Sequence, residues 1–189
     1  MSADQEPKAL PYIEGALLIV FVFLGAFFTF PYLTEKTKPV FIIPGLIEAE
    51  NLQVRGKSPN LFFQIQPTKD FPNGSWTKDS HMFGMADRMD DWIEFSLPIS
   101  QAGKARLNVY LTRSNDYGII QFLLNGKKIG APVDLWTPDS VTDTGKITLG
   151  EFDLPAGTSI LRIEVTGKNP KNESPHYFFG MDGLVIEKI

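Results

Sequence analysis

The sequence predicts an all-β sandwich domain preceded by a single N-terminal apolar helix. Residues 15–33 form an unbroken run without a charged side chain. From Gly45 onward, apolar residues recur with a period of two, which is typical of strands with one buried face and not of helices. Frequent Gly, Pro and Asn turn signals separate these short segments. Many short strands divided by turns indicate a two-sheet sandwich or jelly roll.

The first expected element is a transmembrane helix. At a rise of about 1.5 Å per residue, Gly15–Leu33 would cover roughly 28 Å, close to the thickness of a bilayer's hydrocarbon core. Tyr12 and Tyr32 flank the run, where amphipathic rings favour the membrane interfaces. A signal peptide is the main alternative, but the run is long and lacks a small-residue cleavage site. We therefore expect a short tail (1–14), the helix (15–33), an extended linker (34–44) and the sandwich (45–189).

One face of this helix carries small residues that favour contact with another helix. At about 100° per residue, the face is formed by Gly15, Leu18, Val22, Gly25 and Thr29, with Ala26 at its edge. Gly25 and Thr29 have the spacing of two small residues that lets helices approach closely. The phenylalanines fall largely on the other faces. The alternative is that Gly and Ala are simply common in membrane spans.

The strands follow in order along the chain. Their segments are LIEAENLQV (46–54), LFFQIQ (61–66), DWIEFSL (91–97), ARLNVYLTR (105–113), YGIIQFLL (117–124), KKIG (127–130), KITLGEF (146–152), SILRIEV (159–165) and YFFGMDGLVIEKI (177–189). In 105–113, for example, Leu107, Val109 and Leu111 point to one face. Asn125-Gly126 tolerates positive φ angles and predicts a tight hairpin between two of the segments. No segment after residue 45 keeps a helical period.

Composition and motifs argue against several functions. The formal charge of −4 is unlike that of a nucleic-acid-binding protein. The absence of cysteine excludes disulfides and thiol chemistry. His81 and His176 fit no zinc motif, and no nucleophile or phosphate-loop motif occurs, so we expect no enzyme. The acidic run 87–91 is interpreted as a solvated turn before a strand, and the alternative is an acid–base site.

Four segments resemble the galactose-binding-like jelly rolls. They are IEAEN (47–51), LNVYLTRSNDYGIIQFLLNGKKIGAPVDLW (107–136), LGEFDLPAGTSILRIEVTGKN (149–169) and FGMDGLVI (179–186). Over about residues 45–189 the chain is similar to carbohydrate-binding modules of families 6 and 35. The resemblance implies a jelly-roll β-sandwich, a first strand beside the last strand, and a location outside the cytoplasm.

A structural calcium ion is the one cofactor that we expect. Glu48 and Glu50 are two residues apart and would share a face of an extended strand. The resemblance implies that Asp182, on the last strand, lies near them, and that the matching residues often hold a structural calcium. Three carboxylates repel one another unless a hard cation neutralises them. The alternative is that some of them face solvent or pair with Lys57 or Lys188.

A sugar site would need exposed aromatic planes beside hydrogen-bonding groups. Candidate aromatic residues near the expected loops are Trp76, Tyr117, Trp136 and Tyr177. Candidate hydrogen-bonding residues are Asn115, Asn125 and Asn169. Trp92 lies within an expected strand and is interpreted as a core residue.

Two functions follow from these observations. We favour a non-catalytic accessory subunit that stabilises a larger membrane complex, for example a respiratory or photosynthetic assembly, through its helix and its sandwich. The alternative is a membrane-anchored carbohydrate-binding module of the cell envelope. Either would be a single-pass protein of the bacterial inner membrane with a periplasmic C-terminal domain. Lys36 and Lys38 would favour the opposite orientation, and we give the resemblance to exported modules more weight.

Overall fold

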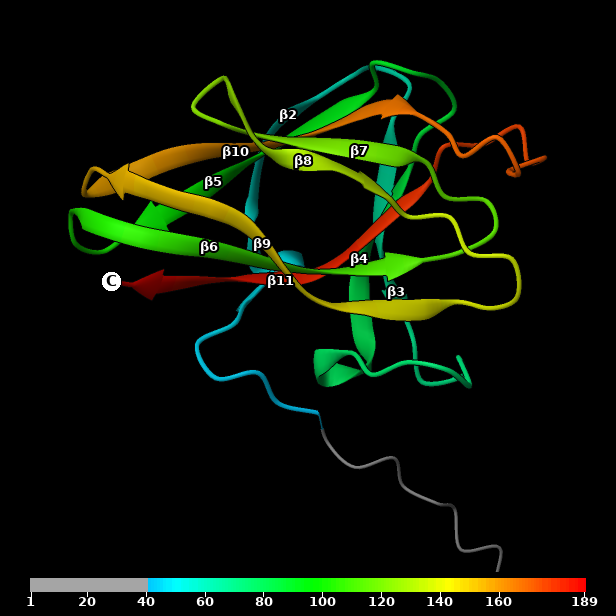
Figure 1. Ribbon diagram of the computed structural model, residues 1–189, viewed down its shortest axis with the longest axis horizontal. Helices are drawn as coiled ribbons and strands as arrows, with labels where there is room; N and C mark the ends of the chain where they lie inside the picture. The colour runs from blue at the N-terminus through cyan, green and yellow to red at the C-terminus, as the bar shows by residue number, and fades with distance from the viewer. Residues whose placement is uncertain (1–40) are drawn as a thin grey trace, which may run out of the picture. The chain divides into compact units, whose positions relative to one another are not determined.

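Two antiparallel sheets pack face to face in the computed structural model, as the period of two predicts (Figure 1). One sheet has the strand order β3-β4-β11-β6-β9, with β1 also paired to β11, and the other has the order β2-β5-β10-β7-β8. The strands are β1 (Ile47–Glu48), β2 (Gln53–Lys57), β3 (Phe62–Pro67), β4 (Ser80–Met85), β5 (Trp92–Ile99), β6 (Gly103–Arg113), β7 (Ile119–Leu124), β8 (Lys127–Asp134), β9 (Thr142–Leu154), β10 (Gly157–Gly167) and β11 (Phe179–Lys188). Two single-turn 3-10 helices, η1 (Ala49–Asn51) and η2 (Thr77–Asp79), interrupt them.

The structure describes residues 41–189. The predicted tail, transmembrane helix and most of the linker lie outside the described residues, and so does the proposed docking face of the helix (Gly15, Leu18, Val22, Gly25, Ala26 and Thr29). Within residues 41–189, no helix is long and apolar enough to cross a membrane.

The hydrophobic core fills the space between the sheets. Leu107, Val109 and Leu111 of β6 are almost fully buried, as their alternation predicts. The facing sheet contributes further buried residues, among them Ile93, Phe95, Leu97, Phe122, Leu161, Ile163 and Val165. Each such side chain stabilises the fold by about 1.5–3 kcal/mol relative to an exposed one. Burial of this apolar face is why period-two patterning located most of the strands, although it missed β4.

The predicted hairpin is present between β7 and β8. Asn125 and Gly126 have φ angles of 49° and 79°, and Leu124 pairs with Lys127. Positive φ at both central residues is the requirement of a type I′ turn. The side chain of Asn125 also joins this turn to β10, because its Oδ1 accepts the Ile160 N–H at 2.8 Å.

The predicted single strand 46–54 is wrong, because the chain changes sheets there. β1 pairs with β11 in one sheet, which agrees with the expected neighbourhood of the first and last strands, whereas β2 pairs with β5 in the other sheet. The connection is η1, whose Ala49 is buried in the core. The sequence predicted that Glu48 and Glu50 share a face of one strand. This prediction is wrong, because Glu48 ends β1 and Glu50 lies in η1.

A long connection between β3 and β4 covers the outer face of the first sheet. Trp76 in this connection donates its Nε1–H to Thr112 of β6 at 2.8 Å, and Ser75 N–H donates to Asp143 of β9 at 2.9 Å. Thr112 points away from the core, on the opposite face of β6 from Leu111, and yet it is fully buried. The connection thus forms a partial third layer that the strand pattern does not reveal.

Trp92 is not a core residue, contrary to the prediction. It begins β5 and is only partly buried, and the guanidinium carbon of Arg162 lies 4.2 Å from its ring centroid. The alternation of β5 explains the difference, since Ile93, Phe95 and Leu97 occupy the inner face.

Candidate functional site

The three acidic residues predicted to bind calcium lie around the Thr77 and Ser80 side chains. The Thr77 hydroxyl lies 2.5 Å from Glu48 Oε2 and 2.8 Å from Asp182 Oδ1. The Ser80 hydroxyl donates to Glu50 Oε1 at 2.6 Å. Lys78, and neither Lys57 nor Lys188, pairs with Glu48, at 3.4 Å. Glu48 of β1 and Asp182 of β11 therefore meet at Thr77, whereas Glu50 of η1 is held by Ser80.

This cluster holds more negative charge than its neighbours neutralise. Burial, and to a lesser degree the charges of Glu48 and Glu50, raise the pKa of Asp182 to about 7. Burial also raises the pKa of Glu50, whose Oε2 is buried with no hydrogen-bond partner within the described residues. A protonated Asp182 would donate to the Thr77 hydroxyl, which in turn donates to Glu48, since one hydroxyl carries a single proton.

The donor chemistry of the cluster fits a hard cation, because carboxylate and hydroxyl oxygens are the ligands that calcium prefers. The carboxylates are not arranged as a metal site in this structure. Within residues 41–189, no group of three or more His, Cys, Asp or Glu side chains is placed to hold an ion. Calcium therefore stays a prediction, and the residues that would hold it are Glu48, Glu50 and Asp182.

Calcium at millimolar concentration is expected to raise the melting temperature of the full chain relative to a chelated sample. The physical reason is mass action, which contributes about 2.7 kcal/mol at a ligand concentration of 100 times the Kd. Asp182→Asn should abolish this increase. A thermal melt followed by tryptophan fluorescence measures it, and an unchanged midpoint would remove the calcium proposal.

Trp76 and Tyr117, two of the predicted sugar-binding residues, offer no exposed plane. Each is only 3% exposed. Trp76 is enclosed by the β3–β4 connection, where an added Cβ on Gly74 would lie 2.4 Å from its ring. Tyr117 stacks on Phe83 at a centroid distance of 6.0 Å. Both residues lie near chain turns, as predicted, but their side chains fold back onto the sheet, so their role is structural.

The amides of Asn125 and Asn169 are engaged within the protein. Besides its contact with β10, Asn125 donates from Nδ2 to Ser159 at 3.3 Å. Asn169 donates to Asp134 at 2.5 Å and accepts the Lys171 N–H at 2.9 Å. These hydrogen bonds fix the hairpin and the β10–β11 loop, respectively. Neither amide is placed as a free sugar-binding group.

Trp136 lines a shallow pocket of about 480 Å³. The three loops that contribute its residues, β6–β7, β8–β9 and β10–β11, lie at one end of the sandwich (Figure 1). The other lining residues are Asn115, Asp116, Pro138, Lys171, Glu173 and Ser174. The Lys171 ammonium lies 5.9 Å from the Trp136 ring centroid. One carboxylate oxygen of Asp116 is buried without a hydrogen-bond partner in the described part of the chain. The pocket thus combines an aromatic side chain, charges of both signs and an unsatisfied acceptor.

Two residues of this pocket, Asn115 and Trp136, were predicted from the sequence as sugar-binding candidates. Three others, Asp116, Lys171 and Glu173, were not. Tyr177, the remaining aromatic candidate, lies outside this pocket and beneath Lys168, whose Nζ is 4.2 Å from its ring centroid. Asn172, buried in the β10–β11 loop, donates to the Tyr117 carbonyl at 2.9 Å and so ties that loop to the β6–β7 loop. No local spacing in the sequence signals such a contact.

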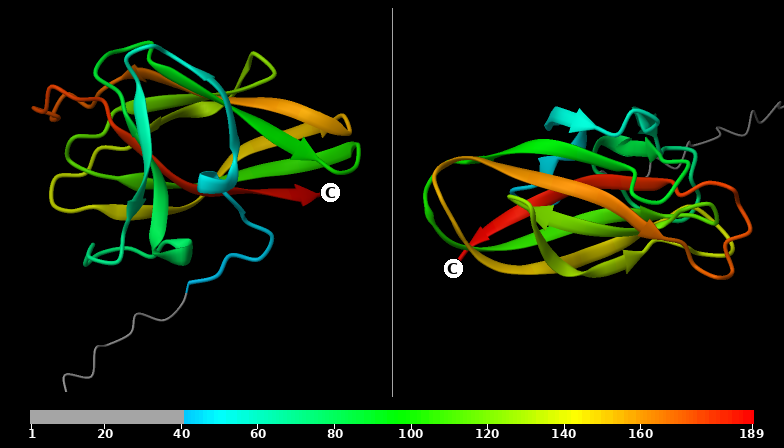
Figure 2. Two further views of the ribbon diagram at one scale, coloured as in Figure 1. Left: turned by 180° about the vertical axis from the view of Figure 1, so that it is seen from behind. Right: turned by 90° about the horizontal axis from the view of Figure 1, so that it is seen from above.

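Exposed apolar side chains gather on β3. This strand lies at the edge of the first sheet, beside β4 (Figure 2). Phe62, Phe63 and Ile65 are 65%, 40% and 61% exposed. Within the described residues, β3 pairs only with β4. Its other edge therefore presents free backbone groups beside three large apolar side chains.

Known proteins resemble the chain in fold. No protein-family model matches it, and no curated protein is significantly similar. A xanthan lyase from Paenibacillus is 21% identical, with a TM-score of 0.65, over 80% of this chain and 14% of the lyase. Family 35 carbohydrate-binding modules from Paenibacillus barcinonensis (18% identical, TM-score 0.45) and Clostridium thermocellum (12% identical, TM-score 0.46) match 76% of this chain and nearly all of their own lengths, 98% and 97%.

The chain spans only a small part of the lyase that it matches, and the likeness concerns the fold alone. The expected resemblance to galactose-binding-like jelly rolls of carbohydrate-active proteins is confirmed at this level. The described residues therefore form a jelly-roll β-sandwich.

Proposed function

We propose that the chain is a non-catalytic accessory subunit of a larger membrane assembly, and that its sandwich binds a partner protein along β3. The observation that carries this proposal is the exposed apolar edge strand with Phe62, Phe63 and Ile65. Natural sheets usually protect an edge with charges, prolines or bulges, because a free edge recruits other strands. A cluster of exposed apolar side chains on such an edge is typical of an interaction site.

A polypeptide strand of the partner is the occupant that fits β3. Its backbone would hydrogen-bond to the free edge, and its side chains would contact both faces of the strand. Phe62 lies on one face, and Phe63 and Ile65 lie on the other, because side chains alternate along a strand. The predicted helix in residues 15–33 would confine the domain to a membrane surface, which supports a partner subunit of a membrane complex.

Mild detergent extraction of the full chain is expected to yield a stoichiometric complex on a native gel, with the partner identified by mass spectrometry. The double variant Phe63→Ser/Ile65→Ser should migrate without the partner. Ile65 is 61% exposed, so its substitution should change the unfolding free energy by no more than about 0.5 kcal/mol. Phe63 is 40% exposed, and its substitution should cost about 1 kcal/mol, which is too little to unfold the domain. Met89→Ser, which alters an equally exposed apolar residue outside β3, is the matched control and should keep the complex.

A carbohydrate-binding module is the second candidate function, and the Trp136 pocket favours it. A pyranose could stack its apolar face on the Trp136 indole and exchange hydrogen bonds with Asn115, Lys171 and Glu173, which line the same pocket. The same preparation separates the candidates. A chain that migrates alone and binds a glycan array, with the binding lost in Trp136→Ala, would support this function and contradict the accessory role.

A further inference from the structure

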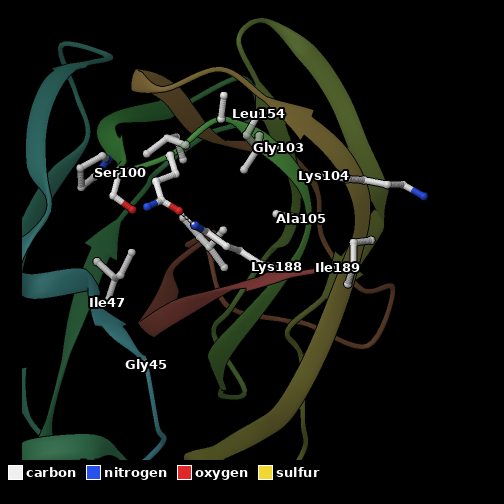
Figure 3. A pocket seen from close by; sticks show the side chains of 14 residues that line it. Gly45, Ile47, Ser100, Gly103, Lys104, Ala105, Leu154, Lys188 and Ile189 are labelled. Carbon is white, nitrogen blue, oxygen red and sulfur yellow. Dashed lines mark hydrogen bonds between the residues drawn. The ribbon is translucent and has the colours of Figure 1, made fainter.

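A second cavity has a volume of about 470 Å³ (Figure 3). The β5–β6 turn that lines it lies at the end of the sandwich opposite the three loops of the Trp136 pocket (Figure 1). The β5–β6 turn, the start of β1 and the end of β11 surround it. Its lining includes an apolar part, here called the floor, which consists of Ile47, Ile99, Ala105, Leu154 and Ile186. Three of these, Ile99, Ala105 and Leu154, are buried core residues. The cavity is therefore an opening between the two sheets, and its size is that of a small-molecule site.

The two lysines on the rim of this cavity differ in their surroundings. Lys188 extends into the hollow, and its ammonium donates to the Gln101 side-chain carbonyl (Figure 3). Among the described residues, no carboxylate lies within ion-pair distance of Lys188. Lys104 points away from the hollow and pairs with Glu151 at 3.1 Å. The cavity thus contains one cation without an anionic partner, next to an amide whose NH₂ group can donate.

We infer that this cavity binds a medium-chain carboxylate. The alkyl chain would lie on the isoleucine and leucine floor, and the carboxylate would accept hydrogen bonds from the Lys188 ammonium and the Gln101 amide. Charge-assisted hydrogen bonds of this kind are shorter and stronger than neutral ones. The apolar floor removes the alkyl chain from water, which provides the remaining affinity. A cationic amphiphile would meet Lys188 and be repelled.

The inference is tested on the full chain in phosphatidylcholine nanodiscs, with empty nanodiscs as the blank. Octanoate is titrated, and binding is read from the melting temperature by tryptophan fluorescence. We expect saturable stabilisation by octanoate, and weaker stabilisation by butyrate, which lacks most of the alkyl contact. Octanol, which keeps the chain but not the charge, should also bind more weakly.

Lys188→Gln should weaken octanoate binding about tenfold or more, because it removes a charge-assisted hydrogen bond. Lys104→Gln is the matched control and should bind octanoate like the wild type. Equal affinity in Lys188→Gln and the wild type would overturn the inference, and so would an equal loss in both variants, which would indicate non-specific attraction to surface charge. The absence of any saturable stabilisation would also overturn it. None of these outcomes bears on the β3 interface.

Discussion

Replacing Asp91 by alanine is expected to destabilise the sandwich by about 4 kcal/mol, more than any other single polar substitution that we consider. Asp91 is 2% exposed. Its carboxylate accepts hydrogen bonds from the Ser58 hydroxyl at 2.7 Å and from the backbone N–H groups of Asp87 and Arg88 at 3.2 and 3.3 Å. Ser58 in turn accepts the Trp92 N–H at 3.2 Å.

The size of the effect follows from the donors that the substitution leaves unsatisfied. Hydrogen bonds to a charged group contribute about 1.5–3 kcal/mol each, and an unsatisfied buried donor costs about 1–3 kcal/mol. The three bonds do not add in full, because water can reach the backbone of the exposed residues 87 and 88. The loss should nevertheless exceed the median for point substitutions, about 1 kcal/mol.

Urea denaturation followed by tryptophan fluorescence measures this free energy. Asp87→Ala is the matched control, because it removes a carboxylate from the same turn whose side chain is 61% exposed and contacts His176. It should change the unfolding free energy by less than about 1 kcal/mol. A loss below 1 kcal/mol for Asp91→Ala would show that the carboxylate does not organise the turn.

Asp91 also shows how far the sequence could predict this region. A run rich in Asp favours a turn, and the chain does turn here, with Asp90 at a φ of 67°. The interpretation of the whole run as solvated is wrong for Asp91. Its burial depends on Ser58, which lies 33 residues earlier on another segment. Composition within a turn cannot indicate which carboxylate meets a distant donor.

The same distinction explains the aromatic candidates. Strand faces could be predicted, because burial of one face imposes alternation on every strand. Exposure in loops could not, because a loop can pack over a sheet. Trp76 follows the turn-forming sequence PNGS and yet lies against Thr112, whereas Trp136 stays at the rim of a pocket. Loop composition therefore predicted the turns correctly. It predicted the exposure of the side chain for Trp136 and not for Trp76.

Acidification is expected to act on stability in opposite directions through His81 and Asp182. His81 is fully buried, and burial lowers its pKa from 6.5 to about 4. Gln66 Oε1 can only accept, so His81 Nε2–H donates to it at 2.7 Å, and in the neutral ring Nδ1 accepts from the Thr112 hydroxyl at 2.6 Å. The Thr112 oxygen also accepts the Trp76 N–H. The neutral imidazole is favoured because the ring is buried, and burial penalises the charged form.

The direction of the His81 effect on stability follows from proton binding. Between pH 6.5 and 4, the unfolded chain binds a proton at His81 and the folded chain does not, so its contribution is fully present above pH 6.5 and is lost as the pH falls towards 4. The loss amounts to about 3 kcal/mol. Asp182 has a folded pKa near 7 against an ordinary value of 3.8. Its contribution is therefore fully present below pH 3.8 and is lost as the pH rises through 7, by about 4 kcal/mol.

Because these two contributions nearly cancel in the wild type, the variants should reveal them. Urea denaturation in the presence of a chelator, at pH 7 and pH 4.5, is the measurement. Relative to the wild type, His81→Gln should gain stability on acidification, since it keeps only the Asp182 effect, and Asp182→Asn should lose stability, since it keeps only the His81 effect. The exposed carboxylates titrate alike in all three proteins, so their effect on the unfolding free energy cancels in the comparison. Packing losses caused by the substitutions do not depend on pH, so they cancel between pH 7 and pH 4.5. Identical pH dependence in all three proteins would show that neither buried group is held in the protonation state that its surroundings impose here.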